Sequence, residues 1–328
     1  MVLVGIVIAM AVLLHTGQSR VSYKSCHGIV WTTQYNITYE SDKTFEDSIQ
    51  QIFLTVDNTL SMFNKSSLIS RINRGEDVKM DSMLERLYVV SKNVNKETCC
   101  AFDPTVSPLM KAWGFVERTG ELPDSAEIDS IREFVGIDKT SIENARLVKT
   151  DSRISFDFSA IAKGFACDEI GGMLSRNGVK NYLVEIGGEI VVNGVNKSGQ
   201  KWHISVDAPV ESNDSVIHDN IMIVSMDKGG IATSGNYRNY KDVNGTKVVH
   251  TMNPLTGYPE ISNLLSATVI AENCMLADAY ATACMVMGLE MSISMMSGRK
   301  DVAVMLVYAM SDGSLVIWTN ETFNTVRK

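Results

Sequence analysis

The chain has 328 residues, of which 45% are hydrophobic and 21% are charged, so it can bury a sizeable core. Its 30 basic and 38 acidic residues give a net charge of −8, and no run of basic residues interrupts that balance. Binding to nucleic-acid backbones needs clustered Lys and Arg, so we expect no nucleic-acid partner.

The N-terminus begins with an unbroken apolar run, MVLVGIVIAMAVLL (1–14), after which polarity returns at 15–20. Fourteen residues are short for a membrane span of about 20, but they suit the apolar region of a signal peptide. No basic residue precedes the run, so it is either an export signal that starts further upstream or an uncleaved anchor. A buried core helix is the alternative. We expect residues 1–20 to be a signal or anchor segment.

The cysteines and histidines indicate no metal cluster. The six cysteines have no C-x-x-C spacing, and most lie in apolar helical stretches, where a thiol behaves as a small hydrophobe. The five histidines are scattered and lack zinc-site spacing. Cys26 could carry a lipid, but it lies well past the apolar run.

The first half of the chain alternates strand and helix patterns. Residues 32–40 alternate with the strand period, and 45–60 have the spacing of an amphipathic helix. A second helix is expected over 81–95 with Asp81 as its N-cap, and a third over 124–135, followed by short strands up to 158.

The second half continues in the same manner. A helix should run from Ala160 to the stop signal Asn177-Gly178. Strands are expected at 182–192 with a break at Gly187-Gly188, at 202–206, at 222–225 and 231–233 in the same sheet, and at 302–308 and 315–318. Two helices, 275–287 and 290–297, should meet at Gly288. No repeat or linker divides the chain, so we predict one interwoven α+β unit with mixed or antiparallel sheets flanked by helices.

Common catalytic and nucleotide-binding fingerprints are missing from the sequence, but the segment ADAYATA (277–283) is informative. Asp278 and Thr282 lie one helical turn apart, so both side chains emerge on one face. A carboxylate and a hydroxyl are hard oxygen ligands suited to Mg²⁺ beside a phosphate. The alternative is a structural Asp and a Thr that bonds back to its own helix.

The segment DFSAIAKGFACD (157–168) combines a carboxylate, a helix start and a lysine. A helix that begins near Ala160 offers free N–H groups and a positive dipole end to an anion, and Lys163 adds charge one turn later. Asp157 would repel a bare phosphate, so the combination favours a nucleotide. The alternative is an N-cap from Asp157 or Ser159, with Lys163 on a solvated face.

Seven segments in order make the chain resemble the ApbE-type FAD:protein FMN transferases, flavin-transferring enzymes of the bacterial envelope. They are SMFNKSSLISRIN (61–73), AFDPTVSPLMKAWGF (101–115), DFSAIAKGFACD, VEIGGEI (184–190), ATSGNYRNY (232–240), HTMNPLTG (250–257) and ADAYATA. The resemblance implies a flavin transferase domain over 28–328 with an ApbE-like, T-fold-related architecture.

The resemblance also implies site residues. Asp278, Thr282 and the Ala160 carbonyl match the family's Mg²⁺ ligands. The matching FAD contacts are Ala101, Phe102, Asp103, Asp157, Lys163 and, through its backbone, Met252. Phe63 stands where the family usually has a pocket-lining tyrosine. Departures are Ser159, Asn253, Ala281 and the run Trp31-Thr32-Thr33, which replaces Met-Gly-Thr.

The implied reaction cleaves FAD, attaches FMN through a phosphoester to a threonine of a target protein such as an electron-transfer or redox-pump subunit, and releases AMP. His250 is the candidate general base, because neutral imidazole suits that task near pH 7; a structural role in the turn is the alternative. An FAD pyrophosphatase and a non-catalytic flavin-binding protein remain alternatives. The implied location is the periplasmic face of the cytoplasmic membrane.

Overall fold

The computed structural model describes residues 22–116, 122–209, 220–236, 240–243 and 246–327. The expected signal or anchor segment at 1–20 lies outside these residues and stays a prediction.

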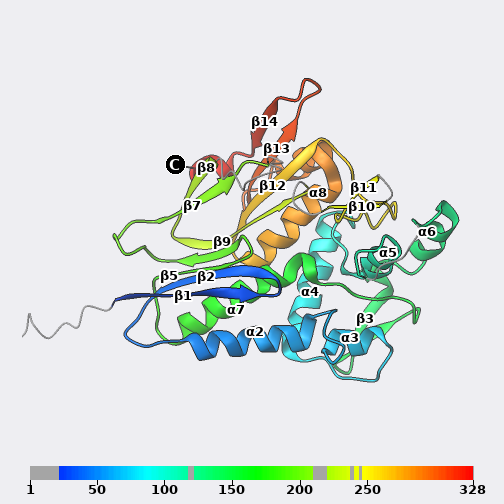
Figure 1. The fold of residues 1–328 in the computed structure, drawn as a ribbon, viewed down its shortest axis with the longest axis horizontal. Coiled ribbons are helices and arrows are strands. Elements are labelled where there is room, and N and C mark those ends of the chain that lie inside the picture. The colour runs from blue at the N-terminus through cyan, green and yellow to red at the C-terminus, as the bar shows by residue number, and fades with distance from the viewer. Residues whose placement is uncertain (1–21, 117–121, 210–219, 237–239, 244–245, 328) are drawn as a thin grey trace, which may run out of the picture.

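An eight-stranded sheet forms the centre of the molecule (Figure 1). Its order is β1-β2-β5-β6-β9-β12-β13-β14, and all neighbours pair antiparallel. The strands are β1 (Tyr23–Val30), β2 (Thr33–Glu40), β5 (Tyr182–Ile186), β6 (Glu189–Asn193), β9 (Lys228–Gly235), β12 (Leu264–Ala271), β13 (Ala303–Ala309) and β14 (Leu315–Thr319). The α+β prediction is confirmed, although β1 and β12 were not anticipated.

Helices cover one face of this sheet in two layers. Helix α7 (Ser159–Arg176) packs on β5 and β6, and α8 (Cys274–Met296) packs on β9 and β12. Outside them lie α2 (Glu46–Leu60), against α7, and α4 (Ser82–Glu97), against α8. The N-cap of α4 is Asp81, as predicted, and its side chain accepts the N–H of Leu84. The main core fills the space between the sheet and these helices.

The opposite face is covered by a separate two-stranded sheet. Strands β7 (Trp202–Asp207) and β8 (Asn220–Met226) pair with each other and not with the large sheet. The expectation that 222–225 extends the main sheet is therefore wrong. Inward-facing residues of this hairpin, including Trp202 and Ile204, form a second core with Ile231, Met305 and Phe323. The central strands β12 and β13 are thus buried on both faces, whereas the outer strands β1, β2 and β14 keep exposed positions.

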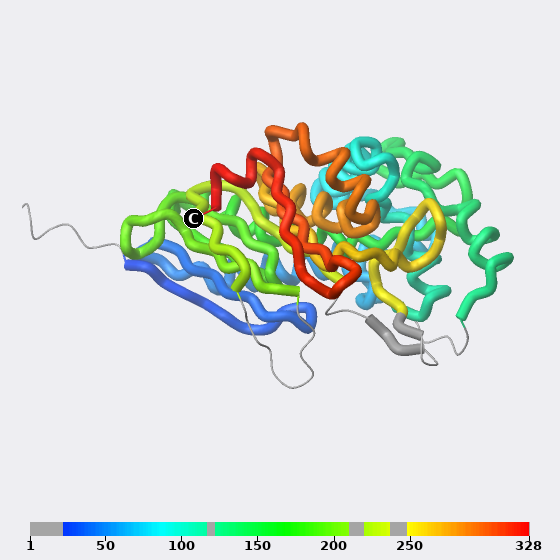
Figure 2. Tube along the Cα trace, turned by 90° about the horizontal axis from the view of Figure 1, so that it is seen from above, coloured from blue at the N-terminus to red at the C-terminus, as the bar shows by residue number. Residues whose placement is uncertain are grey.

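The remaining elements, except for one short helix near the C-terminus, gather at the end of the molecule away from the start of β1, as Figure 2 shows for the cyan and green helices. They are α3 (Leu68–Asn73), η1 (Pro104–Val106), α5 (Ser107–Ala112), α6 (Ser125–Arg132), η2 (Ile137–Lys139), and the hairpins β3 (Thr140–Glu143)–β4 (Arg146–Lys149) and β10 (Tyr240–Val243)–β11 (Thr246–Val249). The short helix η3 (Thr322–Thr325) ends the chain beside β13.

Helices α7 and α8 pack unusually closely, and two residues of α7 explain why. A Cβ added at Gly164 would lie 2.4 Å from the carbonyl oxygen of Cys274, so only glycine permits this approach. One turn later, the Asp168 carboxylate accepts the N–H groups of Cys274 at 2.9 Å and Met275 at 2.8 Å. Burial raises the pKa of Asp168 to about 6, although both hydrogen bonds oppose that rise. Asp168 therefore fixes the start of α8 on α7.

Helix α8 is interrupted at Gly288, whose φ of 69° and ψ of −177° are not helical. The predicted boundary between two helices is confirmed at this residue. By length and hydropathy α8 could cross a membrane, but 56% of its most apolar window is buried inside the fold. We therefore regard it as a core helix of this domain.

Candidate functional site

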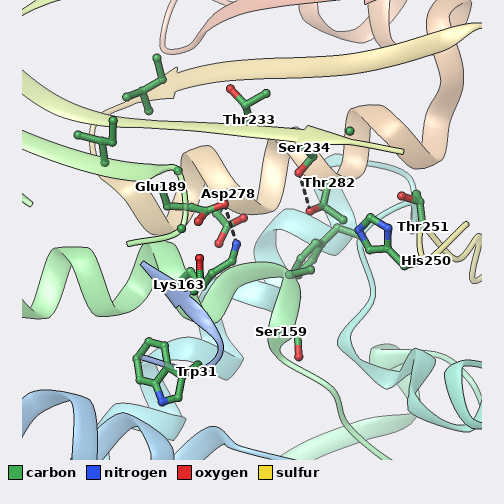
Figure 3. A pocket seen from close by; sticks show the side chains of 18 of the residues that line it. Trp31, Ser159, Lys163, Glu189, Thr233, Ser234, His250, Thr251, Asp278 and Thr282 are labelled. Carbon is green, nitrogen blue, oxygen red and sulfur yellow. Dashed lines mark hydrogen bonds and ion pairs between the residues drawn. The ribbon is translucent and has the colours of Figure 1, made fainter. Parts of the chain in front are cut away.

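A cavity of about 900 Å³ opens where the helix layer meets the large sheet. Its walls come from the β1–β2 turn, the loop before η1, the start of α7, the β5–β6 turn, β7, β9, residues 250–252 and α8. Ligand pockets have volumes of roughly 300–1,000 Å³, so this one can take a large nucleotide. Nearly all the residues that the sequence singled out meet here (Figure 3).

Three charged side chains form what we call the charged floor of the cavity: Lys163, Glu189 and Asp278. Lys163 Nζ lies 2.6 Å from Glu189 Oε1. Glu189 is 4% exposed and Asp278 is 3% exposed. In Figure 3 the two carboxylates lie side by side above the lysine. The Lys163 side chain is 34% exposed, but its ammonium is already ion-paired, so it is not held free for a ligand.

Burial and mutual charge shift the pKa values of the charged floor. Burial raises the pKa of Glu189 to about 7, and the opposing pull of Lys163 limits that rise. Burial also raises the pKa of the Asp278 carboxyl, again against Lys163. Burial alone would lower the pKa of Lys163, but Glu189 and Asp278 together raise it above its usual range. Such mutually dependent buried groups are common at functional sites.

The three expected metal ligands line the same cavity. Asp278 and Thr282 emerge from one face of α8, and the Thr282 hydroxyl lies 3.2 Å from that of Ser234. Asp278 Oδ2 accepts the N–H of Gly164 at 3.1 Å. In a regular helix that N–H serves the carbonyl of Ala160. Because a carbonyl oxygen has two lone pairs, the Ala160 oxygen has capacity for another partner whether or not it also accepts this N–H.

Metal binding here would depend on mixed oxygen donors. Among the described residues, no group of three or more His, Cys, Asp or Glu side chains could hold a metal ion. The donors at this cavity are one carboxylate, one hydroxyl and one main-chain carbonyl, which together supply part of an octahedral Mg²⁺ shell. The donor set fits a hard cation whose remaining ligands come from water and a phosphate.

The start of α7 has no side-chain cap at its N-cap residue, Phe158. Asp157 Oδ1 accepts the N–H of Ser159 at 2.8 Å. One oxygen of this carboxylate therefore caps the first N–H of the helix, which is the structural role that we gave as the alternative to nucleotide binding. Both Asp157 and Ser159 line the cavity. The helix start therefore faces the space where a nucleotide would lie.

The segment 101–103 also lines the cavity, but the Asp103 carboxylate is engaged elsewhere. Its Oδ1 accepts the N–H of Thr105 at 2.8 Å and the Thr105 hydroxyl at 2.6 Å. Its Oδ2 accepts from the Asn95 amide and the Ile137 N–H. With both oxygens used to hold the loop, contact with a nucleotide from Asp103 would come from its backbone. Burial raises the pKa of this carboxyl.

The remaining predicted residues differ in their positions. Met252 lines the cavity but its side chain is 5% exposed in a small core with Trp113 and Ile128, consistent with a backbone contact. His250 lines the cavity on the side away from Lys163 (Figure 3). Phe63 is not among the cavity-lining residues; it is 79% exposed on the loop after α2. Its predicted contact with FAD therefore requires a ligand that extends beyond the cavity.

The tip of the β1–β2 hairpin forms part of the rim. Trp31 and Thr32 have φ values of 48° and 64°, a conformation that disfavours non-glycine residues. The Trp31 ring packs edge-on against Phe53, with ring centroids 5.5 Å apart. The run that departs from the family pattern thus still reaches the cavity.

Sequence reasoning missed Glu189 and Ser234 as site residues. Glu189 could have been predicted from the sequence, because it lies at an inward position of a strand whose other buried residues are Val191 and Val192. A charged residue at such a position needs a partner of opposite charge, and Lys163 is that partner. Ser234 has no comparable signal, since its role depends on β9 lying beside α8.

Comparisons with known proteins identify the family of the chain. A model of the ApbE family matches residues 31–306, so the chain belongs to the ApbE family. A FAD:protein FMN transferase of Vibrio cholerae serotype O1 is 33% identical over 292 residues, 86% of each chain. One of Haemophilus influenzae is 31% identical over 326 residues, 94% of this chain and 93% of the other. The solved structure of the flavin transferase ApbE from Vibrio cholerae matches with a TM-score of 0.82 at 30% identity, covering 93% of this chain and 99% of that one. The T-fold relation stays a prediction.

Proposed function

We propose that this protein is a Mg²⁺-dependent FAD:protein FMN transferase, which attaches FMN to a threonine of a target protein and releases AMP. The observation that carries the proposal is the convergence of Lys163, Asp278, Thr282 and the start of α7 on one cavity. The relatives of Vibrio cholerae and Haemophilus influenzae are named FAD:protein FMN transferases, which supports the transferase part of the proposal.

A Mg²⁺ ion would be held by the Asp278 carboxylate, the Thr282 hydroxyl and the Ala160 carbonyl. When bound, it supplies charge neutralisation for the FAD pyrophosphate. The chain itself supplies orientation. At the start of α7 the N–H of Ser159 is bound to Asp157, and N–H groups further along the first turn are bound to the Phe158 carbonyl. This helix start therefore attracts phosphate oxygens through the positive end of its dipole, and the Lys163 ammonium adds positive charge close to it. Positioning and charge neutralisation provide most of the catalysis in phosphoryl transfer.

The bond changes are simple. The threonine hydroxyl oxygen attacks the phosphorus of the FMN half, and the bond from that phosphorus to the bridging oxygen breaks. AMP leaves with the bridging oxygen and both electrons of the broken bond. His250 is the candidate base that takes the hydroxyl proton, since it lines the cavity at the side away from Lys163.

The target is a protein segment with an accessible threonine, of the kind found in flavin-carrying electron-transfer or redox-pump subunits. Such a segment must reach into the cavity from the rim. We place the reaction at the periplasmic face of the cytoplasmic membrane, because the apolar run at 1–14 has the character of an export or anchor signal. A test is cell fractionation with and without residues 1–20; equal cytoplasmic recovery of both forms would contradict this location.

The central experiment incubates the protein with FAD, Mg²⁺ and a target protein that carries a single candidate threonine. Intact-mass measurement should show the target gain one FMN, and AMP should appear in equal amount. Free FMN with an unmodified target would indicate an FAD pyrophosphatase. Bound FAD without any AMP would indicate a flavin-binding protein.

A further inference from the structure

Glu189 has a role that the proposed reaction does not yet use. Its carboxylate is buried, and Oε1 is bound to Lys163 at 2.6 Å. In the described part of the chain, Glu189 Oε2 and Ser91 Oγ are the buried side-chain atoms without a hydrogen-bond partner. Glu189 also lines the cavity. An orphaned buried carboxylate oxygen is costly, so this atom points to a ligand that brings a donor.

The charge balance of the charged floor indicates which ligand. Lys163 contributes one positive charge, whereas Glu189 and Asp278, when ionised, contribute one negative charge each, and pH 8 lies above the pKa of about 7 of Glu189. Asp168, close enough to act on Asp278, adds further negative character. The net charge is therefore negative, despite the lysine. Without a cation, this floor repels a pyrophosphate.

Hydrogen bonding leads to the same conclusion independently. A phosphate group offers mostly acceptor oxygens, which cannot satisfy Glu189 Oε2. A hydrated divalent cation offers O–H donors from its water shell together with positive charge, and Mg²⁺ usually keeps several waters. Charge and donor count both favour the cation over the nucleotide as the first occupant.

We propose that Glu189 is a specificity-determining residue, which neutralises Lys163 so that the cavity binds a divalent cation first and admits the FAD pyrophosphate only afterwards. The inference rests on the proposed function and adds an order of binding to it. Lys163 becomes available to phosphate once the cation has shifted the charge balance.

The test uses Glu189→Gln, which removes one charge while it keeps the shape and an acceptor for Lys163. The matched control is Glu185→Gln. Glu185 lies on the same β5–β6 hairpin and lines the same cavity, but its carboxylate accepts a hydrogen bond from Asn36 at 3.1 Å. Calorimetry at pH 8 measures two constants for each protein: Mg²⁺ binding without nucleotide, and FAD binding in EDTA. Riboflavin, which lacks phosphate, reports damage to the ring contacts.

For Glu189→Gln we expect Mg²⁺ to bind at least about tenfold more weakly and FAD in EDTA to bind at least about tenfold more tightly. Tenfold is the low end of the effect that one nearby charge has on a buried ionisable group, about one to three pKa units. Riboflavin affinity should stay unchanged. Glu185→Gln removes a charge that lines the cavity but lies outside the charged floor, so it should shift the Mg²⁺ and FAD constants much less than Glu189→Gln does and leave riboflavin affinity unchanged. The double variant Lys163→Met/Glu189→Gln restores the net negative charge and should recover wild-type Mg²⁺ affinity.

The proposal is wrong if Glu189→Gln leaves both constants unchanged, if both weaken together, or if Glu185→Gln shifts them equally. Should Glu189→Gln fail to fold, Lys163→Met tests the same balance from the other side: Mg²⁺ should then bind more tightly and FAD in EDTA more weakly. Failure of the proposed function gives a different result. In that case the wild-type protein would transfer no FMN to any target, even if Mg²⁺ and FAD bind in the proposed order.

Discussion

The close approach of α7 and α8 can be tested with one methyl group. A Cβ at Gly164 would lie 2.4 Å from the Cys274 carbonyl oxygen and 2.9 Å from Asp278 Cβ. The first is a main-chain atom that cannot swing aside, so Gly164→Ala must push the helices apart. Overpacking of this kind costs about 1–3 kcal/mol, more than the roughly 1 kcal/mol that alanine gains in helix propensity.

Gly172, on the same helix, provides the control. Its added Cβ would meet only the end of the Arg176 side chain, 3.2 Å away, which can move. Gly172→Ala should therefore be neutral or stabilising by up to about 1 kcal/mol. Urea unfolding of the two variants should differ in midpoint with similar slopes.

The same displacement should reach the site. Moving α8 away from α7 separates Asp278 from the Gly164 N–H and from Lys163, so Gly164→Ala should also weaken Mg²⁺ binding measured by calorimetry, whereas Gly172→Ala should not. If Gly164→Ala proves as stable as Gly172→Ala and binds Mg²⁺ normally, the packing does not position the carboxylate as we describe.

Four further outcomes are expected. Asp278→Asn should abolish FMN transfer and the Mg²⁺ dependence of FAD binding while the protein stays folded, because Asn still accepts the Gly164 N–H; Mg²⁺ dependence that persists undiminished would place the ion elsewhere. His250→Gln should slow transfer by about 10²–10⁴-fold without weakening FAD, if the imidazole is the base; an unchanged rate in single-turnover assays would assign it a structural role. The pKa of Asp168 is higher in the folded chain, about 6, than its ordinary 3.8, so the folded state binds more protons between these values and this group's contribution to stability falls as pH rises from about 4 to 6; Asp168→Asn should flatten that part of the unfolding profile. Phe63→Ala should leave the unfolding midpoint unchanged, since the ring is 79% exposed, and should reduce FAD affinity by about 1 kcal/mol if the ring stacks on the ligand.

Most secondary structure could be predicted because it rests on local signals. Asp81 and Asp124 cap helices where the sequence places them, and Gly187-Gly188 breaks a strand into β5 and β6. Strand β12 escaped notice because LLSATVIA is buried along most of its length and lacks alternation. The pairing of β7 with β8 alone depends on which strands meet in space, and periodicity carries no such information.

The candidate site was predictable where one element supplies the geometry. Asp278 and Thr282 share a face of α8 by helical spacing alone, and both reach the cavity. The partner of Lys163 was not predictable in this manner, because Glu189 comes from the following hairpin and approaches only through the packing of α7 on β6. The engagement of Asp103 by four donors was equally hidden, since Ile137 lies far along the chain.

The position of α8 late in the chain has a consequence for the newly made protein. Lys163 and Glu189 precede Asp278 by many residues, and strands β9 and β12, which complete the central sheet around them, also come late. A chain still on the ribosome therefore lacks the proposed cation site until residue 282 has emerged. Before that point the unfinished chain lacks both Asp278 and Thr282, the two side chains proposed to hold Mg²⁺. Competence to use the nucleotide is thus gained only near the completion of synthesis.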